Sequence, residues 1–147
     1  SSSSRAASSL AAKAAASSKL SALYEGDVEM VIASGDLGDL GITPGHTPLI
    51  TSLKAGPVRL VFEDGEDELF FVSGGFLEAI PFQVTILADT AERADNLDEA
   101  AALAAKEEAA RLLDEQQSEF EYSRAAVELA DAVARLRVIE QLRHRRA

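Results

Sequence analysis

The chain has no cysteine and no tryptophan, and aromatic residues make up only 5% of its 147 residues. Without cysteine it can form neither a disulfide nor a thiolate metal site, which suits a protein of a reducing compartment. With so few aromatic side chains, its core must consist of aliphatic residues and alanine with a few phenylalanines. It also lacks an apolar run of 18 residues, so the sequence predicts no helix that crosses a membrane.

Basic residues are scarce, with 14 against 25 acidic residues and a formal net charge of −11. Such a surface repels phosphates almost everywhere, which excludes a general nucleic-acid-binding role. The chain has two histidines, no phosphate-binding glycine-rich loop with a lysine, and no clustered metal ligands. We therefore expect no catalysis by the chain alone and no metal site.

The C-terminal segment, residues 122–146, has the clearest periodicity in the sequence. Apolar residues recur at helical spacing along about six turns. They are Tyr122, Ala126, Leu129, Val133, Leu136 and Ile139. From residue 124 onward the chain holds six arginines and three acidic residues, whereas the other 123 residues hold eight basic and 22 acidic residues. Compensation of the helix dipole explains one or two arginines. We therefore expect this helix, with net charge +3, to face its own acidic chain or an acidic partner.

Residues 1–22 form an atypical arm that is rich in serine and alanine, with three basic residues and no acidic one. This composition fits a transit peptide, an appended tail or a disordered arm. We assign the arm no function.

Residues 23–90 read as short strands that are separated by glycine, proline and acidic turns. In one of them Val58, Leu60 and Phe62 alternate with Arg59 and Val61. Several such segments with no helix between them predict a small antiparallel β-sandwich or flattened barrel.

At residue 95 the periodicity changes to that of a helix. Asn96, with Glu99 three residues later, predicts a capping box. An alanine-rich helix should end near Leu113, and the polar segment 114–121 predicts a turn to the basic helix. Alanines should line the seam between the two helices and bury little area, so we expect a weakly held hairpin. These are Ala101, Ala104, Ala105 and Ala109 against Ala126, Ala130 and Ala134. The predicted fold is thus α+β with two domains, an N-terminal antiparallel β-sandwich (residues 23–90) and a C-terminal antiparallel α-helical hairpin (residues 95–147).

Five segments, from about residue 23 to the end, resemble the epsilon subunit of bacterial F-type ATP synthases in order and spacing. They are residues 41–49 (GITPGHTPL), 72–78 (VSGGFLE), 84–91 (VTILADTA), 97–100 (LDEA) and 136–140 (LRVIE). Residues 1–22 depart from the family pattern, which has a strand near this position.

The resemblance implies a non-catalytic rotor subunit of the central stalk, which couples proton-driven rotation of the c-ring to ATP synthesis. The sandwich would bind the gamma subunit and stand on the c-ring. The loop of residues 35–46 matches the ring-facing loop, with Asp39 and His46 as contact residues. For His46 a second interpretation is a turn residue that bonds to a backbone carbonyl. The subunit would be peripheral to the cytoplasmic face of the bacterial inner membrane, and attached only through the complex.

The resemblance also implies autoinhibition. In the family the hairpin either folds beside the sandwich or extends along gamma, where its basic residues meet acidic loops of the alpha and beta catalytic subunits and obstruct rotation. We expect Arg124, Arg135, Arg137 and Arg143 to make these contacts, and we call them the brake arginines. The hypothesis is a bistable hairpin, with weak alanine packing in one state and arginine–carboxylate pairing in the other.

ATP binding to the folded hairpin, a third property of the family, is not expected here. Glu92 and Asp98 match acidic positions of the family's nucleotide motif. Ala101 and Glu108 stand where two arginines would be expected, and an acidic residue in place of a cation repels phosphate. We therefore predict weak or absent ATP binding and no cofactor.

Two local expectations concern the sandwich and its junction with the hairpin. Gly74 and Gly75 should serve backbone geometry rather than a contact with a partner. Asp89 and Arg93, four residues apart, should pair at the junction.

Two alternative functions stay open. One is the mitochondrial delta subunit, the epsilon counterpart with a cleaved transit sequence, which the arm favours and the segment 136–140 and the inhibitory helix disfavour. The other is a stand-alone adaptor whose amphipathic basic helix docks on an acidic partner. Such an adaptor has no reason to carry the segments 41–49 and 73–78.

Overall fold

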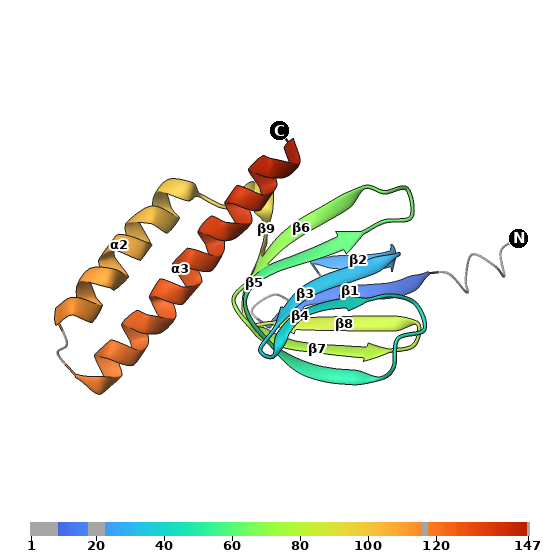
Figure 1. Cartoon of the computed structure of the whole chain (residues 1–147), viewed down its shortest axis with the longest axis horizontal. Coiled ribbons are helices and arrows are strands. Elements are labelled where there is room, and N and C mark those ends of the chain that lie inside the picture. Colours follow the sequence, from blue (N-terminus) through green and yellow to red (C-terminus); the bar gives the residue numbers. More distant parts are fainter. Residues whose placement is uncertain (1–8, 18–22, 116–117, 147) are drawn as a thin grey trace, which may run out of the picture.

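The structure is a computed structural model that describes residues 9–17, 23–115 and 118–146. Figure 1 shows a body of strands with two antiparallel helices beside it, and α3 lies between α2 and the strands. The elements are β1 (Leu10–Ala16), β2 (Tyr24–Val28), β3 (Met30–Gly35), β4 (Gly38–Ile42), β5 (Leu49–Val61), β6 (Asp67–Val72), β7 (Gly75–Ile80), β8 (Gln83–Ala88), β9 (Ala91–Arg93), the 3-10 helix η1 (Ala94–Asn96), α2 (Glu99–Glu115) and α3 (Glu119–Arg146). The predicted α+β fold, a β-sandwich followed by a helical hairpin, is confirmed.

The strands belong to one sheet that folds over on itself. Its main path runs β2-β1-β8-β7-β5-β3-β4, and β6 pairs with β5 and β9. The sheet can fold over because the two halves of the long strand β5 pair with different strands. Its residues 49–53 pair with β7, and its residues 56–61 pair with β6. The pairs are antiparallel as predicted, except that β1 and β8 are parallel.

Strand β1 lies within the Ser/Ala-rich arm, to which the sequence analysis assigned no structure. Leu10, Ala12, Ala14 and Ala16 are buried, and the residues between them are more exposed. The burial pattern has the period of two that a strand requires. Alanine is depleted in strands, so its pattern was a weak signal. Residues 1–8 and 18–22 of the arm lie outside the described residues.

The core of the sandwich is mainly aliphatic, as the composition predicts. Its largest fully buried side chains come from most strands of the sheet, and one phenylalanine is among them. They are Leu10, Val31, Ile42, Val58, Leu60, Phe70, Leu77 and Val84. The sandwich therefore has its own core, separate from the smaller cluster that joins it to the hairpin.

Both long helices begin at a side-chain cap. Asp98 Oδ1 accepts a hydrogen bond from the backbone N–H of Ala101 at 3.1 Å, and Ser118 Oγ accepts one from that of Glu121 at 3.1 Å. The predicted capping box at Asn96 is wrong, because Asn96 belongs to η1 and Asp98 caps α2 instead.

Helix α3 buries two opposite faces. On one face Ala134 and Val138 pack against Leu69, Phe71 and Ala94 of the sandwich and its junction. On the other face α3 packs against α2, where the buried alanines of the hairpin are Ala102, Ala109, Ala125 and Ala132. Most of the alanines that were predicted to line the seam therefore do not lie in it. Of the predicted alanines, Ala109 lies in the seam, Ala126 is half-buried, Ala134 faces the sandwich, and Ala101, Ala104, Ala105 and Ala130 are exposed.

Candidate functional site on helix α3 and the sandwich

Arg135 lies at the contact between α3 and the sandwich. Its Nη1 donates to Glu92 of β9 at 2.5 Å, and its Nε donates to Asp131, one turn earlier, at 3.0 Å. The guanidinium carbon lies 4.4 Å from the ring centroid of Phe71, a cation–π distance. Burial lowers the pKa of Arg135, but the bonds to Asp131 and Glu92 outweigh burial and raise that pKa above its usual value. The guanidinium therefore stays charged and is held by carboxylates of its own chain.

Two arginines near the end of α3 are held in the same way. Arg143 Nη2 donates to the carboxylate of Glu99 at the start of α2. Arg145 Nη2 donates to the carboxylate of Asp67 on β6, and to the backbone oxygen of the same residue at 3.1 Å. Asp67 also accepts a bond from Arg59 Nε at 2.6 Å, so it lies between two arginines. Sequence reasoning did not find this contact, because Arg145 is 78 residues from its partner.

The other two brake arginines, Arg124 and Arg137, form no ion pair with a described residue of the sandwich. Arg124 Nε bonds to Glu128 of its own helix at 3.3 Å, and its side chain is 73% exposed. Arg137 is exposed and forms no ion pair with any residue that the structure describes. The four brake arginines thus form two classes. Arg135 and Arg143 bond to carboxylates of other elements, whereas Arg124 and Arg137 form no ion pair with another described element and are exposed.

The two positions of the nucleotide motif have structural roles here. Glu92 is bound to α3, as described above, and Asp98 caps α2. At the positions expected to be basic, Ala101 offers no charge. Glu108 accepts two bonds from Arg111, at 3.2 and 2.5 Å, and these bonds lower the pKa of its carboxyl group. The site therefore offers no free cation for a phosphate at these two positions.

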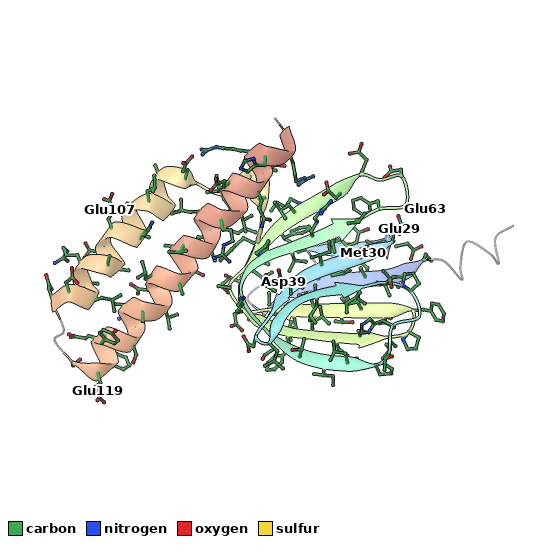
Figure 2. The ribbon with its side chains drawn as sticks, viewed as in Figure 1. Glu29, Met30, Asp39, Glu63, Glu107 and Glu119 are labelled. Carbon is green, nitrogen blue, oxygen red and sulfur yellow. The ribbon has the colours of Figure 1, made fainter. Side chains whose placement is uncertain are left out.

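The predicted ring-facing loop, residues 35–46, is in the structure a turn followed by strand β4 and a second turn. Its two candidate residues lie at opposite ends of β4. Asp39 lies at the end near α3, as Figure 2 shows. At the other end His46 Nδ1 donates to the carbonyl of Thr47 at 2.6 Å, and Gly45 bonds to Pro81 between β7 and β8. The prediction that both residues lie in one loop is wrong. The carbonyl bond agrees with the second interpretation of His46.

Asp39 also contributes to a groove of about 360 Å³ between the sandwich and the end of α3. Its floor includes Ile32 and Pro57, and its other wall is formed by His144 and Arg145. The groove therefore depends on the folded position of the hairpin.

An exposed apolar surface covers part of the sheet away from the hairpin. Phe76 of β7 lies directly across from Leu87 of β8, and their exposed fractions are 61% and 51%. Ile50, Ile80 and Phe82 extend this surface over β5 and the turn between β7 and β8. We call these five residues the apolar sheet face. The sequence contained a signal for this surface, because β7 and β8 have apolar residues at outward-facing as well as at inward-facing positions.

In the part of the chain that the structure describes, no helix is long and apolar enough to cross a membrane, and no group of three acidic or histidine residues is placed to hold a metal ion.

Two family models match the chain. The β-sandwich domain of the ATP synthase delta/epsilon chain matches residues 18–94, and the long α-helix domain of that chain matches residues 95–140. The ATP synthase epsilon chain of Chromohalobacter salexigens is 55% identical over 124 residues, which cover 84% of this chain and 88% of that relative.

Two solved assemblies contain chains of similar fold. One is the mitochondrial ATP synthase of Euglena gracilis, OSCP/F1/c-ring in rotational state 1, with a TM-score of 0.79 at 18% identity, covering 86% of this chain and 79% of that one. The other is the central stalk and c-ring of the mitochondrial ATP synthase of Tetrahymena thermophila, with a TM-score of 0.56 at 12% identity, covering 88% and 96%. At these identities the likeness establishes the fold.

Proposed function

The chain belongs to the delta/epsilon family of ATP synthase subunits, and from that premise we propose a role for each of its two domains. The two family models and the 55% identical epsilon chain place it with the epsilon subunits of bacterial F-type enzymes, as a subunit of the ATP synthase complex. These findings do not favour a mitochondrial delta subunit or a stand-alone adaptor. Within the complex we assign it a non-catalytic place in the rotor, on the cytoplasmic face of the bacterial inner membrane.

The sandwich binds the gamma subunit through the apolar sheet face. This surface supports the proposal because large apolar side chains such as Phe76 and Leu87 are grouped there, and grouped exposed side chains of this kind mark interaction sites. It lies away from the hairpin, so gamma can cover it in either hairpin state.

Binding of gamma can be measured with variants of this surface. Phe76→Glu should weaken the affinity for gamma by about tenfold or more, because a buried aromatic anchor contributes more than about 1 kcal/mol. Phe120→Glu makes the same change at a phenylalanine that is 77% exposed on α3, outside the apolar sheet face. Equal affinities for the two variants would contradict this assignment of the gamma contact.

The c-ring contact remains assigned to Asp39 and His46, and the structure makes the assignment testable. Because the two residues lie at opposite ends of β4, Asp39→Asn and His46→Asn probe different ends of the sandwich. The variant that weakens attachment of the complex to the c-ring identifies the end that stands on the ring. If neither does, both assignments fail.

The hairpin inhibits ATP hydrolysis when it extends and its brake arginines meet acidic loops of the alpha and beta subunits. The observation that carries this proposal is the concentration of basic charge on α3, which has net charge +3 from residue 124 onward in a chain of net charge −11. Each desolvated arginine–carboxylate contact contributes about 1.5–3 kcal/mol.

Arg137 gives the cleanest test of inhibition, because it makes no ion pair with a described residue in the folded state. Arg137→Gln should therefore raise the ATP hydrolysis rate of the complex without loosening the folded hairpin. The matched control is Arg111→Gln, at an exposed arginine of α2 that bonds to Glu108 and Glu115. An unchanged rate in Arg137→Gln would remove this residue from the inhibitory contact.

We further propose that the hairpin binds ATP weakly or not at all. Support comes from Glu92, which bonds to Arg135, and from Glu108, which stands where a cation would face phosphate. Calorimetry on the full chain should show no saturable heat at micromolar ATP. Micromolar binding would overturn the proposal.

A further inference from the structure

We infer that carboxylates of the sandwich occupy arginines of α3 in the folded hairpin and oppose its extension, with Asp67 as the principal holding residue. The inference deepens the proposed function, since it names what keeps the inhibitory helix away from the catalytic subunits. It also revises the hypothesis of a bistable hairpin, which placed arginine–carboxylate pairing in the extended state only. Arginine–carboxylate pairs are present in the folded state as well, so extension must first break the bonds of Arg135 and Arg145 to the sandwich. Arg135 is a brake arginine, so in this proposal both states use its guanidinium.

Asp67 holds the end of α3 through both its side chain and its backbone. One carboxylate oxygen accepts from Arg59 of β5 and the other from Arg145 of α3, which also bonds to the Asp67 carbonyl. The Asp67 side chain is only 12% exposed, so this pairing is less screened by water than the surface pairs of the hairpin. We call Asp67, Arg59 and Arg145 the Asp67 cluster.

A second contact holds the middle of α3. Glu92 of β9 accepts from Arg135, whose guanidinium also lies over the Phe71 ring. The Arg135 side chain is 28% exposed and that of Glu92 is 42% exposed, so this pair is more solvated than the Asp67 cluster. We therefore rank Glu92 second to Asp67 as a holding residue.

Not every pair resists extension. Arg143 bonds to Glu99 of α2, so this bond lies within the hairpin and survives if both helices swing away together. The bonds of Arg135 and Arg145 join the hairpin to the sandwich and must break. Arg135, one of the brake arginines, therefore reaches a catalytic subunit only after its bond to Glu92 has broken.

Substitution of the carboxylate and substitution of an arginine of the Asp67 cluster should have different effects on the folded hairpin. Asp67→Asn leaves Arg59 and Arg145 facing each other without a negative charge between them, which disfavours the folded position. Arg145→Gln removes the two bonds that Arg145 donates to Asp67, but it leaves the Arg59–Asp67 pair intact and no cation facing another. The structure therefore predicts that Asp67→Asn releases α3 more strongly than Arg145→Gln does.

Because the natural chain has no cysteine, a single introduced thiol can report release of α3 from the sandwich. Ala134 is 3% exposed at this contact, and Ala79 is 1% exposed in strand β7. In the full chain, the rate of thiol labelling at Ala134→Cys measures opening of the hairpin, and the rate at Ala79→Cys measures opening of the sandwich.

We expect Asp67→Asn to speed thiol labelling at Ala134→Cys about tenfold, which corresponds to the loss of one charge-assisted contact. Arg145→Gln should speed this labelling less. Labelling at Ala79→Cys should not change. Glu63→Gln is the matched control, because Glu63 is an exposed acidic residue of the turn between β5 and β6. The inference is overturned if Asp67→Asn acts no differently from Glu63→Gln, or if it speeds labelling equally at both positions.

ATP hydrolysis by the complex then separates this inference from the proposed function. Asp67→Asn should lower the hydrolysis rate when α3 is present and have no effect when residues 119–147 are removed. If labelling responds but hydrolysis does not, the holding contact stands and the inhibitory role of the hairpin fails. If hydrolysis responds to removal of α3 but labelling does not respond to Asp67→Asn, the inhibitory role stands and the holding contact fails.

Discussion

Gly75 shows how much one residue constrains the sandwich. Its φ is +134°, and a Cβ placed on it would lie 2.1 Å from the Leu87 carbonyl oxygen and 2.7 Å from the Ala88 Cα. These are backbone atoms of the neighbouring strand and cannot move aside. Gly45 has a φ of +86° but open space around it. The sequence-based expectation that Gly74 and Gly75 serve backbone geometry agrees with the positive φ angles of both.

We predict that Gly75→Ala destabilises the chain by more than about 3 kcal/mol, because a clash adds to the conformational strain. Gly45→Ala carries strain alone and should cost about 1 kcal/mol. Urea unfolding of the two variants measures the difference. Similar losses would show that the β7–β8 contact is less tight than described.

Tyr24 makes the free energy of unfolding depend on pH at alkaline pH. Burial raises the pKa of its phenol above 10.0, and Glu68 and Asp27 raise it further. Above that pH the unfolded chain loses its phenolic proton before the folded chain does, so rising pH favours unfolding. The stabilisation is present below about pH 10 and is lost as pH rises through the folded-state pKa.

Tyr24→Phe should therefore reduce the fall in the free energy of unfolding between about pH 9 and about pH 11. Tyr122→Phe is the control, because the chain has two tyrosines and Tyr122 is 48% exposed on α3. Urea unfolding at several pH values gives, for each variant, the slope of the free energy of unfolding against pH. An equal slope for Tyr24→Phe and the unsubstituted chain would contradict the raised pKa.

At the scale of elements, the seam between α2 and α3 is held by small side chains. Ala109 is 1% exposed in that seam, whereas its neighbour Ala110 is exposed on the same helix. A leucine at the first position has no room and must separate the helices, whereas at the second it extends into solvent.

Ala109→Leu should cost about 1–3 kcal/mol through overpacking, and Ala110→Leu should change stability by no more than about 0.5 kcal/mol. Thermal unfolding followed by helix content compares them. A seam that tolerates both changes equally would mean that α2 is not packed on α3 as described.

The elements that sequence predicted well are those with strong periodicity. Most strands from residue 23 onward and both helices follow from alternation and helical spacing, but β4 was expected to be part of a loop and β9 was not predicted. Strand β1 was missed because alanine carries little strand signal. The wrong alanines were assigned to the seam because seven of the 17 residues of α2 are alanines that are spread around the helix, so composition alone does not identify its buried face.

Contacts between elements were beyond sequence reasoning. Asp89 and Arg93 were expected to pair because they are four residues apart, but Arg93 lies in β9 and its Nη1 bonds to Glu68 at 2.9 Å. The bond from Arg145 to Asp67 spans 78 residues of the chain. The helical spacing on which the first prediction rested does not apply to a strand, and no spacing rule applies to the second.

At the scale of the whole molecule, charge is separated along the sequence and brought together by the fold. The acidic body and the basic end of α3 pack against each other, and three arginines of α3 bond to carboxylates of other elements. In the proposed function, extension of the hairpin exchanges the carboxylates of the sandwich that bind Arg135 and Arg145 for those of the catalytic subunits. We therefore propose that the difference between the two sets of contacts, rather than either set alone, sets the degree of inhibition.

The most direct test of this account is the rate of ATP hydrolysis by the assembled complex with the full chain and with a chain that ends at residue 118. The account predicts a higher rate when α3 is absent, and a smaller rise of the same sign for Arg137→Gln. An identical rate with and without α3 would contradict it.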